Sequence, residues 1–340
     1  MTVRVGVNGF GRIGRNFLRA VIALGADIDL VAINDLTSPD IHAQLLRHDS
    51  TRGALGVPVA VDGTDLVVGD RRFAVLSERD PSNLPWEELG VEVVIESTGV
   101  FTSRADASGH LKGGASRVII SAPSRDADVT VIVGVNDSHF DPSVHEIVSN
   151  ASCTTNCFVP MVKVIEDAFG LAGGLMTTVH AYTNDQNLLD LPHRDPRRAR
   201  SAAINIVPSS TGAARSTRKV LPQMDGLLDG TALRVPVACG SITDFTALVP
   251  VQVSVEEVNE AFRTASLSGP LSAILDYTEE PIVSSDVLGN PASCLFDAGL
   301  TLALTIGENQ TLIKANGWYD NEWGYANRLV DLVLLVAKKR

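Results

Sequence analysis

The feature that most constrains the fold is a glycine-rich run near the N-terminus, Gly9-Phe-Gly11-Arg-Ile-Gly14. It follows a short apolar stretch, residues 3–7, that predicts a buried strand, and residues 12–24 have the apolar spacing of a helix. Glycines at such a strand-to-helix turn allow a tight turn and close approach to a pyrophosphate, which the helix N-terminus stabilises. By itself the run also fits a purely structural turn.

Asp35 strengthens the cofactor interpretation. It ends the next predicted strand, residues 29–33, about 20 residues after Gly14. An acidic side chain at this point suits a ribose 2′-hydroxyl and repels a 2′-phosphate. Together the two features predict NAD binding. The alternative for Asp35 is a helix cap after Asn34.

The first part of the chain alternates strand-like and helix-like segments. Residues 91–95 and 118–120 predict further buried strands, and residues 41–46 predict a helix. This rhythm indicates a parallel sheet with right-handed crossovers. We therefore expect an α/β domain of the Rossmann type.

The pattern changes after about residue 152. Residues 153–169 predict a helix that Pro160 kinks or interrupts, and Ser254 with Glu257 forms a capping box that opens a helix to about residue 265. Residues 325–339 predict a C-terminal amphipathic helix that ends in Lys338, Lys339 and Arg340. Strand-like runs cover 175–182, 233–237, 243–249 and 311–315. We expect an α+β domain with a mixed, largely antiparallel sheet.

Charge and cysteine content exclude several classes of protein. The net charge is −12, which argues against a generic nucleic-acid surface because such surfaces rely on Lys and Arg. The chain has 4 cysteines and no evident export signal. We therefore expect a location in the reducing cytoplasm and no disulfide framework. The apolar run 329–337 is too short to span a bilayer, and we expect no membrane partner.

A candidate nucleophile stands where a predicted strand turns into a helix. Cys153 would begin that helix, whose dipole and N–H groups favour the thiolate and lower the thiol pKa. Cys157, one turn on, should lie deeper. His180, in a strand leading into a loop, is the candidate base for such a thiol. The alternatives are buried structural cysteines, a structural histidine, or a metal site, but the spacing lacks a second ligand pair and we expect no metal.

These motifs together resemble the phosphorylating glyceraldehyde-3-phosphate dehydrogenases. The resemblance runs in order along nearly the whole chain. The matching segments are NGFGRIGR (8–15), ND (34–35), ERDP (78–81), ESTG (96–99), SAPS (121–124), NASCTTNC (150–157), HAYTNDQ (180–186), DLPHRDPRRAR (190–200), STGAA (210–214), RVP (234–236) and WYDNEWGYANR (318–328).

The resemblance implies a division into domains and a set of cofactor residues. Residues 1–152, completed by a C-terminal helix over 321–340, would form the NAD-binding Rossmann domain, and residues 153–320 the catalytic domain. Gly9, Gly11, Arg12, Ile13 and Gly14 would meet the pyrophosphate. Asp35 would bind the adenosine ribose, Arg79 would lie on the adenine side, and Ser121 and Asn321 would orient the nicotinamide.

The implied reaction is a step of glycolysis and gluconeogenesis. Cys153 would attack the aldehyde, His180 would take up the proton, and phosphate would cleave the resulting thioester to give 1,3-bisphosphoglycerate. Thr183 and Arg234 would bind the substrate phosphate. The attacking phosphate would meet Ser152, Thr154, Arg198, Thr211 and Gly212. The alternative for the arginines at 197, 198 and 200 is a solvated or subunit-facing charge run. The family also implies a homotetramer, with the loop 184–205 packed against a neighbouring subunit.

Three stretches depart from the family pattern. Residues 237–240 (Val-Ala-Cys-Gly) replace a stretch that usually contains proline and asparagine, Arg218 adds a positive charge after STGAA, and residues 37–39 alter the loop beyond Asp35. The rival interpretations are an erythrose-4-phosphate dehydrogenase, an NADP-preferring biosynthetic paralogue, and a catalytically inactive NAD-binding regulator or RNA binder. The retained TNDQ and PHRDPRRAR segments, Asp35, and the pair Cys153 and His180 favour the main interpretation.

Overall fold

The computed structural model describes residues 2–338, which divide into two compact units. Within these residues, the first unit contains 2–131, 137–151 and 326–338, and the second contains 132–136 and 152–325. Met1, Lys339 and Arg340 lie outside the described residues, and with them the last two cations of the expected C-terminal helix.

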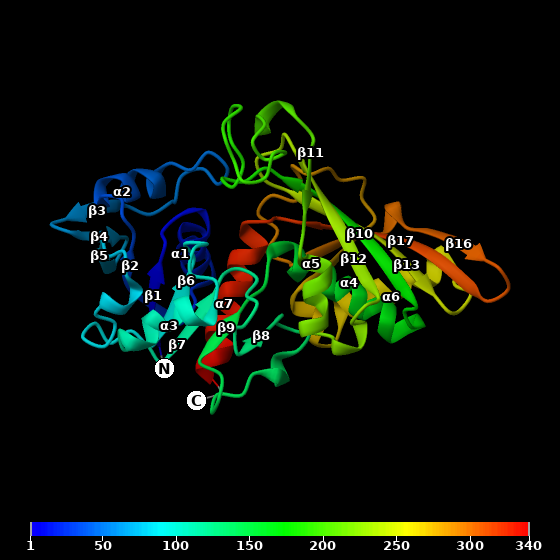
Figure 1. Cartoon of the computed structure of the whole chain (residues 1–340), viewed down its shortest axis with the longest axis horizontal. Coiled ribbons are helices and arrows are strands. Elements are labelled where there is room, and N and C mark those ends of the chain that lie inside the picture. The colour runs from blue at the N-terminus through cyan, green and yellow to red at the C-terminus, as the bar shows by residue number, and fades with distance from the viewer. Residues whose placement is uncertain (1, 339–340) are drawn as a thin grey trace. The chain divides into compact units, whose positions relative to one another are not determined.

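The first unit is built on a sheet with the strand order β3-β4-β5-β2-β1-β6-β7-β9-β8 (Figure 1). From β5 to β8 all neighbouring strands are parallel, which confirms the predicted Rossmann-type sheet. The antiparallel strands β3 and β4 at the edge were not predicted from the sequence. The strands are β1 (Val3–Asn8), β2 (Ile28–Asn34), β3 (Val59–Asp62), β4 (Asp65–Val68), β5 (Arg71–Leu76), β6 (Val93–Glu96), β7 (Arg117–Ile120), β8 (Val129–Thr130) and β9 (Ile147–Ser149).

Burial explains why these runs are almost continuously apolar. β6 is buried along its whole length and β1 nearly so, as expected for parallel strands covered on both faces. The helix after β1 ends at Gly25 in the left-handed conformation, which closes the turn back to β2. The helices of this part are α1 (Arg12–Leu24), α2 (Pro39–Arg47) and α3 (Arg104–Lys112).

The second unit contains a sheet with the order β11-β12-β10-β13-β17-β15-β14, and β16 pairs with β17. The long strands β10, β12, β13 and β17 lie side by side (Figure 1), and most pairings in this sheet are antiparallel. The predicted mixed, largely antiparallel sheet is therefore confirmed. Its strands are β10 (Gly173–Ala181), β11 (Val207–Ser210), β12 (Leu228–Val235), β13 (Ser241–Val249), β14 (Leu275–Thr278), β15 (Cys294–Asp297), β16 (Leu302–Ile306) and β17 (Gln310–Tyr319).

Helices α4 (Cys153–Phe169), α5 (Ala213–Ser216) and α6 (Val255–Leu267) pack in this unit, and α4 contacts β13, β15 and β17. The predicted capping box opens α6, with both reciprocal hydrogen bonds present. α4 continues through Pro160, so this proline does not end the helix. The last helix, α7 (Trp323–Lys338), belongs to the first unit from Ala326 onward. No helix within residues 2–338 has both the length and the apolar character needed to cross a membrane.

Candidate active site

The three glycines of the N-terminal run have different reasons to be glycine. Gly9 has a φ of +89°, and a Cβ there would lie 2.6 Å from the backbone nitrogen of Thr98. A Cβ at Gly14 would lie 2.5 Å from the carbonyl oxygen of Gly9. A Cβ at Gly11, in contrast, would meet nothing within 4 Å. Packing of the protein itself explains Gly9 and Gly14, whereas Gly11 leaves open space of the kind a pyrophosphate requires.

This open space belongs to a cavity of about 400 Å³ within the first unit. The cavity brings together Gly9, Gly11, Asp35 and Arg79 from the predicted cofactor set. Its other lining residues are Asn8, Asn34, Leu36, Glu78, Ser97, Thr98, Val100 and Phe101. Ser121 lies outside this lining, at the end of β7, where its N–H donates to the carbonyl of Glu96.

Asp35 is held at the cavity by backbone donors. Its carboxylate accepts from the N–H of Phe10 at 2.9 Å and from that of Thr37 at 3.1 Å. The helix-cap alternative for Asp35 is wrong, because α2 begins at Pro39 with Ser38 as its N-cap. The carboxylate oxygens retain acceptor capacity for ribose hydroxyls.

The side chain of Arg12, predicted to meet the pyrophosphate, is engaged by the protein itself. Its guanidinium donates to Asp49 at 2.6 Å and to Thr51 at 3.0 Å. Burial alone would raise the pKa of Asp49, but the hydrogen bonds from Arg12 and from two backbone N–H groups lower it to about 2. The Arg12 side chain therefore braces the loop after α2.

A buried polar network below the cavity was not predicted from the sequence. Trp86 Nε1 can only donate, so it fixes His110 Nδ1 as an acceptor at 3.1 Å and places the imidazole proton on Nε2. His110 Nε2 then donates to Glu96 at 3.0 Å, and Asn8 donates to the same carboxylate oxygen at 2.6 Å. Asn34 donates to Asn8 at 2.7 Å. The network fixes the carboxyl ends of β1, β2 and β6.

In the second unit, Cys153 is the first residue of α4, as predicted. Ser152 is the N-cap, and its hydroxyl accepts from the N–H of Thr155. Ala151, just before it, has a φ of +54°, a conformation that alanine rarely adopts and that often marks functional sites. Cys153 is partly exposed, whereas Cys157 is fully buried and its thiol lies 3.5 Å from the carbonyl oxygen of Gly317. The deeper position expected for Cys157 is confirmed.

His180, the last residue but one of β10, lies beside Cys153. Its Nε2 is 3.4 Å from Cys153 Sγ, and the residue is almost fully buried. Nδ1 lies 2.7 Å from the carbonyl oxygen of Ala181 and 2.6 Å from Nη1 of Arg234. A proton on Nδ1 suits the carbonyl and leaves Nε2 as an acceptor for the thiol proton. The other tautomer accepts from Arg234 and suits a thiolate.

Although Cys153 as a whole residue is partly exposed, desolvation dominates the ionisation of this pair. Desolvation raises the pKa of the Cys153 thiol to about 11, with Arg234 as the main opposing influence. Burial, followed by the charge of Arg234, lowers the pKa of His180 to about 3. The thiol pKa lowering expected from the helix N-terminus is therefore wrong for the thiol ionising alone, because desolvation outweighs it. Proton transfer from Sγ to Nε2 instead creates two opposite, adjacent charges that stabilise each other.

Arg234 is the feature that gives the site its charge. In the register of the parallel strands β10 and β12 it lies directly opposite His180, and its Nη1 donates to the carbonyl of Ala181 at 2.9 Å. Among the described residues no carboxylate pairs with it, and its buried Nε has no hydrogen-bond partner. Burial lowers its pKa. A guanidinium in this state is a ready site for an anion.

Arg198 is near enough to Arg234 that the two charges interact. Burial and then Arg234 lower the pKa of Arg198. Arg198 forms ion pairs with Asp185 and Asp195, so it differs from Arg234 in having carboxylate partners. The charge of Arg198 is thus balanced by carboxylates, and the side chain is not a freely solvated surface arginine. Its Nη2 also lies 3.4 Å from the carbonyl oxygen of Ser210, next to Thr211 and Gly212.

The remaining predicted anion-binding residues have varied local roles. Thr211 accepts from the N–H of Ala213, and Gly212 is the N-cap of α5 with open space around its Cα. The N–H of Thr183 donates to Gln186 at 3.3 Å. Thr154 hydrogen bonds to the Tyr319 hydroxyl at 2.9 Å.

Tyr319 was not among the site residues predicted from the sequence. Its hydroxyl also bonds to Thr178 at 2.8 Å, and its ring meets His180 edge-on at 5.9 Å. It therefore ties α4 to β10 beside the Cys153–His180 pair. Its position inside the WYDNEWGYANR segment was an available signal, but nothing in that spacing indicated contact with His180.

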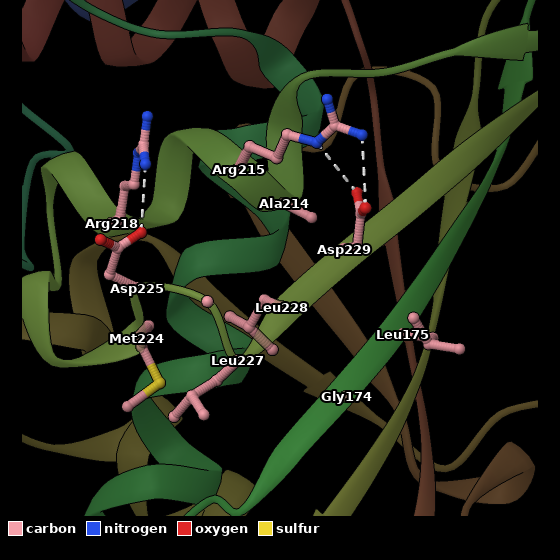
Figure 2. Close-up of a pocket in the computed structure, with 11 residues that line it drawn as sticks. Gly174, Leu175, Ala214, Arg215, Arg218, Met224, Asp225, Leu227, Leu228 and Asp229 are labelled. Atoms are coloured by element: carbon pink, nitrogen blue, oxygen red, sulfur yellow. Dashed lines mark hydrogen bonds and ion pairs between the residues drawn. The ribbon is translucent and has the colours of Figure 1, made fainter.

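Arg218, one of the departures from the family pattern, lies at a separate cavity of about 400 Å³ at the start of β12. Figure 2 shows Arg218 turned toward Asp225 and Arg215 toward Asp229, each within ion-pair distance. Leu175, Met224 and Leu227 line the rest. Because both arginines have an aspartate partner, Arg218 does not create an anion site here.

Comparison with known proteins places this geometry in a family. Two family models match the chain. The model described as "Glyceraldehyde 3-phosphate dehydrogenase, NAD binding domain" matches residues 3–104, and the model described as "Glyceraldehyde 3-phosphate dehydrogenase, C-terminal domain" matches residues 152–321. The chain belongs to the glyceraldehyde-3-phosphate dehydrogenase family. Named glyceraldehyde-3-phosphate dehydrogenases from Streptomyces coelicolor and Mycobacterium avium are 54% and 56% identical to it, over 100% and 99% of both chains respectively. A third such enzyme, from Streptomyces avermitilis, is 52% identical over 100% of both chains.

Membership of the glyceraldehyde-3-phosphate dehydrogenase family agrees with the geometry of the glycine turn and with that of the thiol site. The matched NAD-binding region contains the open glycine turn and Asp35, and the matched C-terminal region contains Cys153, His180 and Arg234. The family resemblance drawn from the sequence motifs is thereby confirmed.

Proposed function

We propose that this chain is an NAD-dependent, phosphorylating glyceraldehyde-3-phosphate dehydrogenase that forms a thioester at Cys153. The observation that carries this is the thiol–imidazole pair beside Arg234, a guanidinium without a carboxylate partner among the described residues. A thiol and a base perform acyl chemistry, and an uncompensated cation selects a phosphorylated substrate. Family membership and the full-length relatives support the same activity.

The reaction begins at Cys153 Sγ. As Sγ bonds to the aldehyde carbon, its proton passes by way of His180 Nε2 to the aldehyde oxygen, which becomes a hydroxyl, and Arg234 and Thr183 hold the phosphate of the substrate. NAD, when bound, would supply the acceptor for the hydride that leaves this carbon. His180 Nε2, free of its proton again, takes up the hydroxyl proton as the carbonyl of the Cys153 thioester forms. An oxygen of inorganic phosphate then attacks the thioester carbonyl, and the Cys153 thiolate leaves as the acyl phosphate forms.

For the cofactor, the residues of the first unit fit NAD. Gly9, Gly11, Gly14, Arg12 and Ile13 would serve the pyrophosphate, Asp35 the adenosine ribose, and Arg79 the adenine. The open space beside Gly11 and the Asp35 carboxylate at the cavity support this assignment. Ser121 and Asn321 would orient the nicotinamide. Ser152, Thr154, Arg198, Thr211 and Gly212 would bind the attacking phosphate, supported by the position of Arg198 beside Ser210.

We further propose a catalytic domain over 153–320, a Rossmann domain over 1–152 with 321–340, a homotetramer, and a cytoplasmic location. The loop 184–205 supports assembly, because Leu188 and Leu189 are 75% and 72% exposed, which is costly in a monomer. Analytical ultracentrifugation tests the tetramer. A monomer at micromolar concentration would contradict it.

The experiment for the activity is a steady-state assay that compares two aldehydes and two cofactors. Glyceraldehyde 3-phosphate with NAD and phosphate should give the highest kcat/KM. A higher kcat/KM with erythrose 4-phosphate would favour the erythrose-4-phosphate dehydrogenase alternative. A large preference for NADP would contradict the role proposed for Asp35.

A further inference from the structure

A chain of hydrogen bonds in the second unit connects the end of β10, which carries His180, to Asn321. The Oδ1 atom of Asn321 accepts from the N–H of Gly240 at 3.1 Å and lies 3.1 Å from the hydroxyl oxygen of Ser241. That hydroxyl in turn accepts from the N–H of Ala181 at 3.1 Å. Ser241 therefore stands between the catalytic-base strand and Asn321.

The donors fix which way the Asn321 amide points. The N–H of Gly240 can only donate, so the amide atom facing it must be the oxygen. Ser241 uses an oxygen lone pair for Ala181, and its own proton is directed to Oδ1. A flipped amide would place an NH2 group against both donors. Nδ2 is left without a partner among residues 2–338, and so the amide presents a donor to any ligand.

The backbone of this segment is itself held in place. Gly240 has a φ of +91°, and a Cβ there would lie 2.3 Å from the carbonyl oxygen of Ser284. Cys239 donates to Asp320 at 3.1 Å, and the same carboxylate oxygen accepts from the N–H of Trp323. The 237–240 stretch, where this chain departs from its family, thus hydrogen bonds to Asp320 and to Asn321 itself.

We propose that Ser241 is a positioning residue that locks the Asn321 amide with Nδ2 outward and ties it to the strand of the catalytic base. The consequence is selectivity for a cofactor group that accepts a hydrogen bond, namely the carbonyl oxygen at position 3 of the pyridinium ring. This inference rests on the proposed function, which assigns Asn321 to the nicotinamide.

Binding calorimetry on the intact chain tests the proposal with three probes: NAD, its 3-acetylpyridine analogue, which keeps the carbonyl but lacks the NH2, and the analogue without a 3-substituent. The parent should bind NAD and the acetyl analogue with similar Kd, and the unsubstituted analogue about tenfold more weakly, as loss of a hydrogen bond predicts. In Ser241→Ala, Oδ1 loses one of its two donors and a flipped amide becomes accessible. The ratio of the acetyl-analogue Kd to the NAD Kd should then rise about fivefold.

Two further variants separate positioning from a general loss of structure. Ser241→Thr retains the hydroxyl and should restore the parent ratio. Thr243→Val, on the same strand, removes a buried hydroxyl that has no hydrogen-bond partner within residues 2–338, and should leave the ratio unchanged. In turnover, Ser241→Ala should raise the KM for NAD more than it lowers kcat.

An unchanged ratio in Ser241→Ala, or equal binding of all three probes by the parent, would overturn the proposal. A parent that binds NAD as proposed but lacks phosphate-dependent turnover would contradict the proposed function and leave the positioning result standing. A parent that binds none of the probes would overturn both.

Discussion

The glycine turn of the first unit is shaped by the backbone, whereas the thiol site of the second unit is formed by side chains. At the turn, the backbone itself makes the space: Gly9 and Gly14 satisfy packing, and Gly11 leaves room. At the thiol site, side chains from α4, β10 and β12 converge within hydrogen-bond distance. The first kind of site has a fixed spacing in sequence, whereas the second depends on strand register. The two should therefore respond to mutation in different ways.

The largest expected effect is confined to the thiol site. Cys153→Ser should lower phosphate-dependent NADH formation by at least about a thousandfold, because serine is a far weaker nucleophile at neutral pH. The Kd for NAD, measured by calorimetry, should stay within about twofold of the parent if the two sites are separable in this way. Retention of activity would contradict the role of Cys153.

Arg234→Met should separate function from stability at the same site. We expect kcat/KM for glyceraldehyde 3-phosphate to fall about a hundredfold, since charged hydrogen bonds to the phosphate are lost. The thermal midpoint in phosphate-free buffer should not fall, because the variant removes a partly buried charge that lacks a carboxylate partner among the described residues. Added phosphate should stabilise the parent more than the variant.

If Arg234→Met instead lowered the thermal midpoint by many degrees in phosphate-free buffer, Arg234 would be a structural residue. Thr243→Val offers a matched control, since it replaces another polar side chain of this sheet outside the proposed anion site.

The glycine turn offers a paired test in the other unit. Gly9→Ala should lower the free energy of unfolding by about 1–3 kcal/mol, because it combines a positive φ with a backbone clash. Gly11→Ala should leave that free energy within about 0.5 kcal/mol of the parent and weaken NAD binding about tenfold. Urea unfolding and calorimetry measure the two quantities. Equal NAD affinity of Gly11→Ala and the parent would place the pyrophosphate elsewhere.

The smallest effect is a pH dependence of stability. Folding lowers the pKa of His180 from an ordinary 6.5 to about 3, so the unfolded chain takes up the proton first as pH falls. The contribution of this group is present above pH 6.5 and is lost below it, by about 1.4 kcal/mol per pH unit. The contribution of Asp49, whose folded pKa is about 2, is present above about pH 4 and is lost only below it, so Asp49 does not affect the slope between pH 7 and 5.5.

Urea unfolding at pH 7 and 5.5 measures this slope, and His180→Gln should reduce it. An equal slope in parent and variant would show that His180 is not held neutral by the fold.

Much of the fold follows from periodicity and turn chemistry. The runs 3–7, 12–24 and 153–169 each match an observed element within a few residues, because burial on one face or both leaves a local pattern. The edge strands β3 and β4 escaped prediction, since they are short and half exposed. Network members such as His110 and Tyr319 escaped as well, because their partners lie far away in sequence.

The same limit applies to the electrostatics of Cys153. Its place at a helix N-terminus could be read from the local sequence, but the desolvation that raises its pKa depends on the packing around it. Likewise, the position of Arg234 opposite His180 follows from the register of β10 on β12, which no local motif specifies.

The central element of the proposed mechanism is a Cys153 thioester that persists until phosphate cleaves it. The most direct test mixes the intact chain with NAD and glyceraldehyde 3-phosphate in phosphate-free buffer and records NADH absorbance in a stopped-flow instrument. A thioester mechanism predicts a burst of about one NADH per chain, then near arrest, and renewed turnover when phosphate is added. Steady NADH formation without phosphate, or no burst at all, would contradict it.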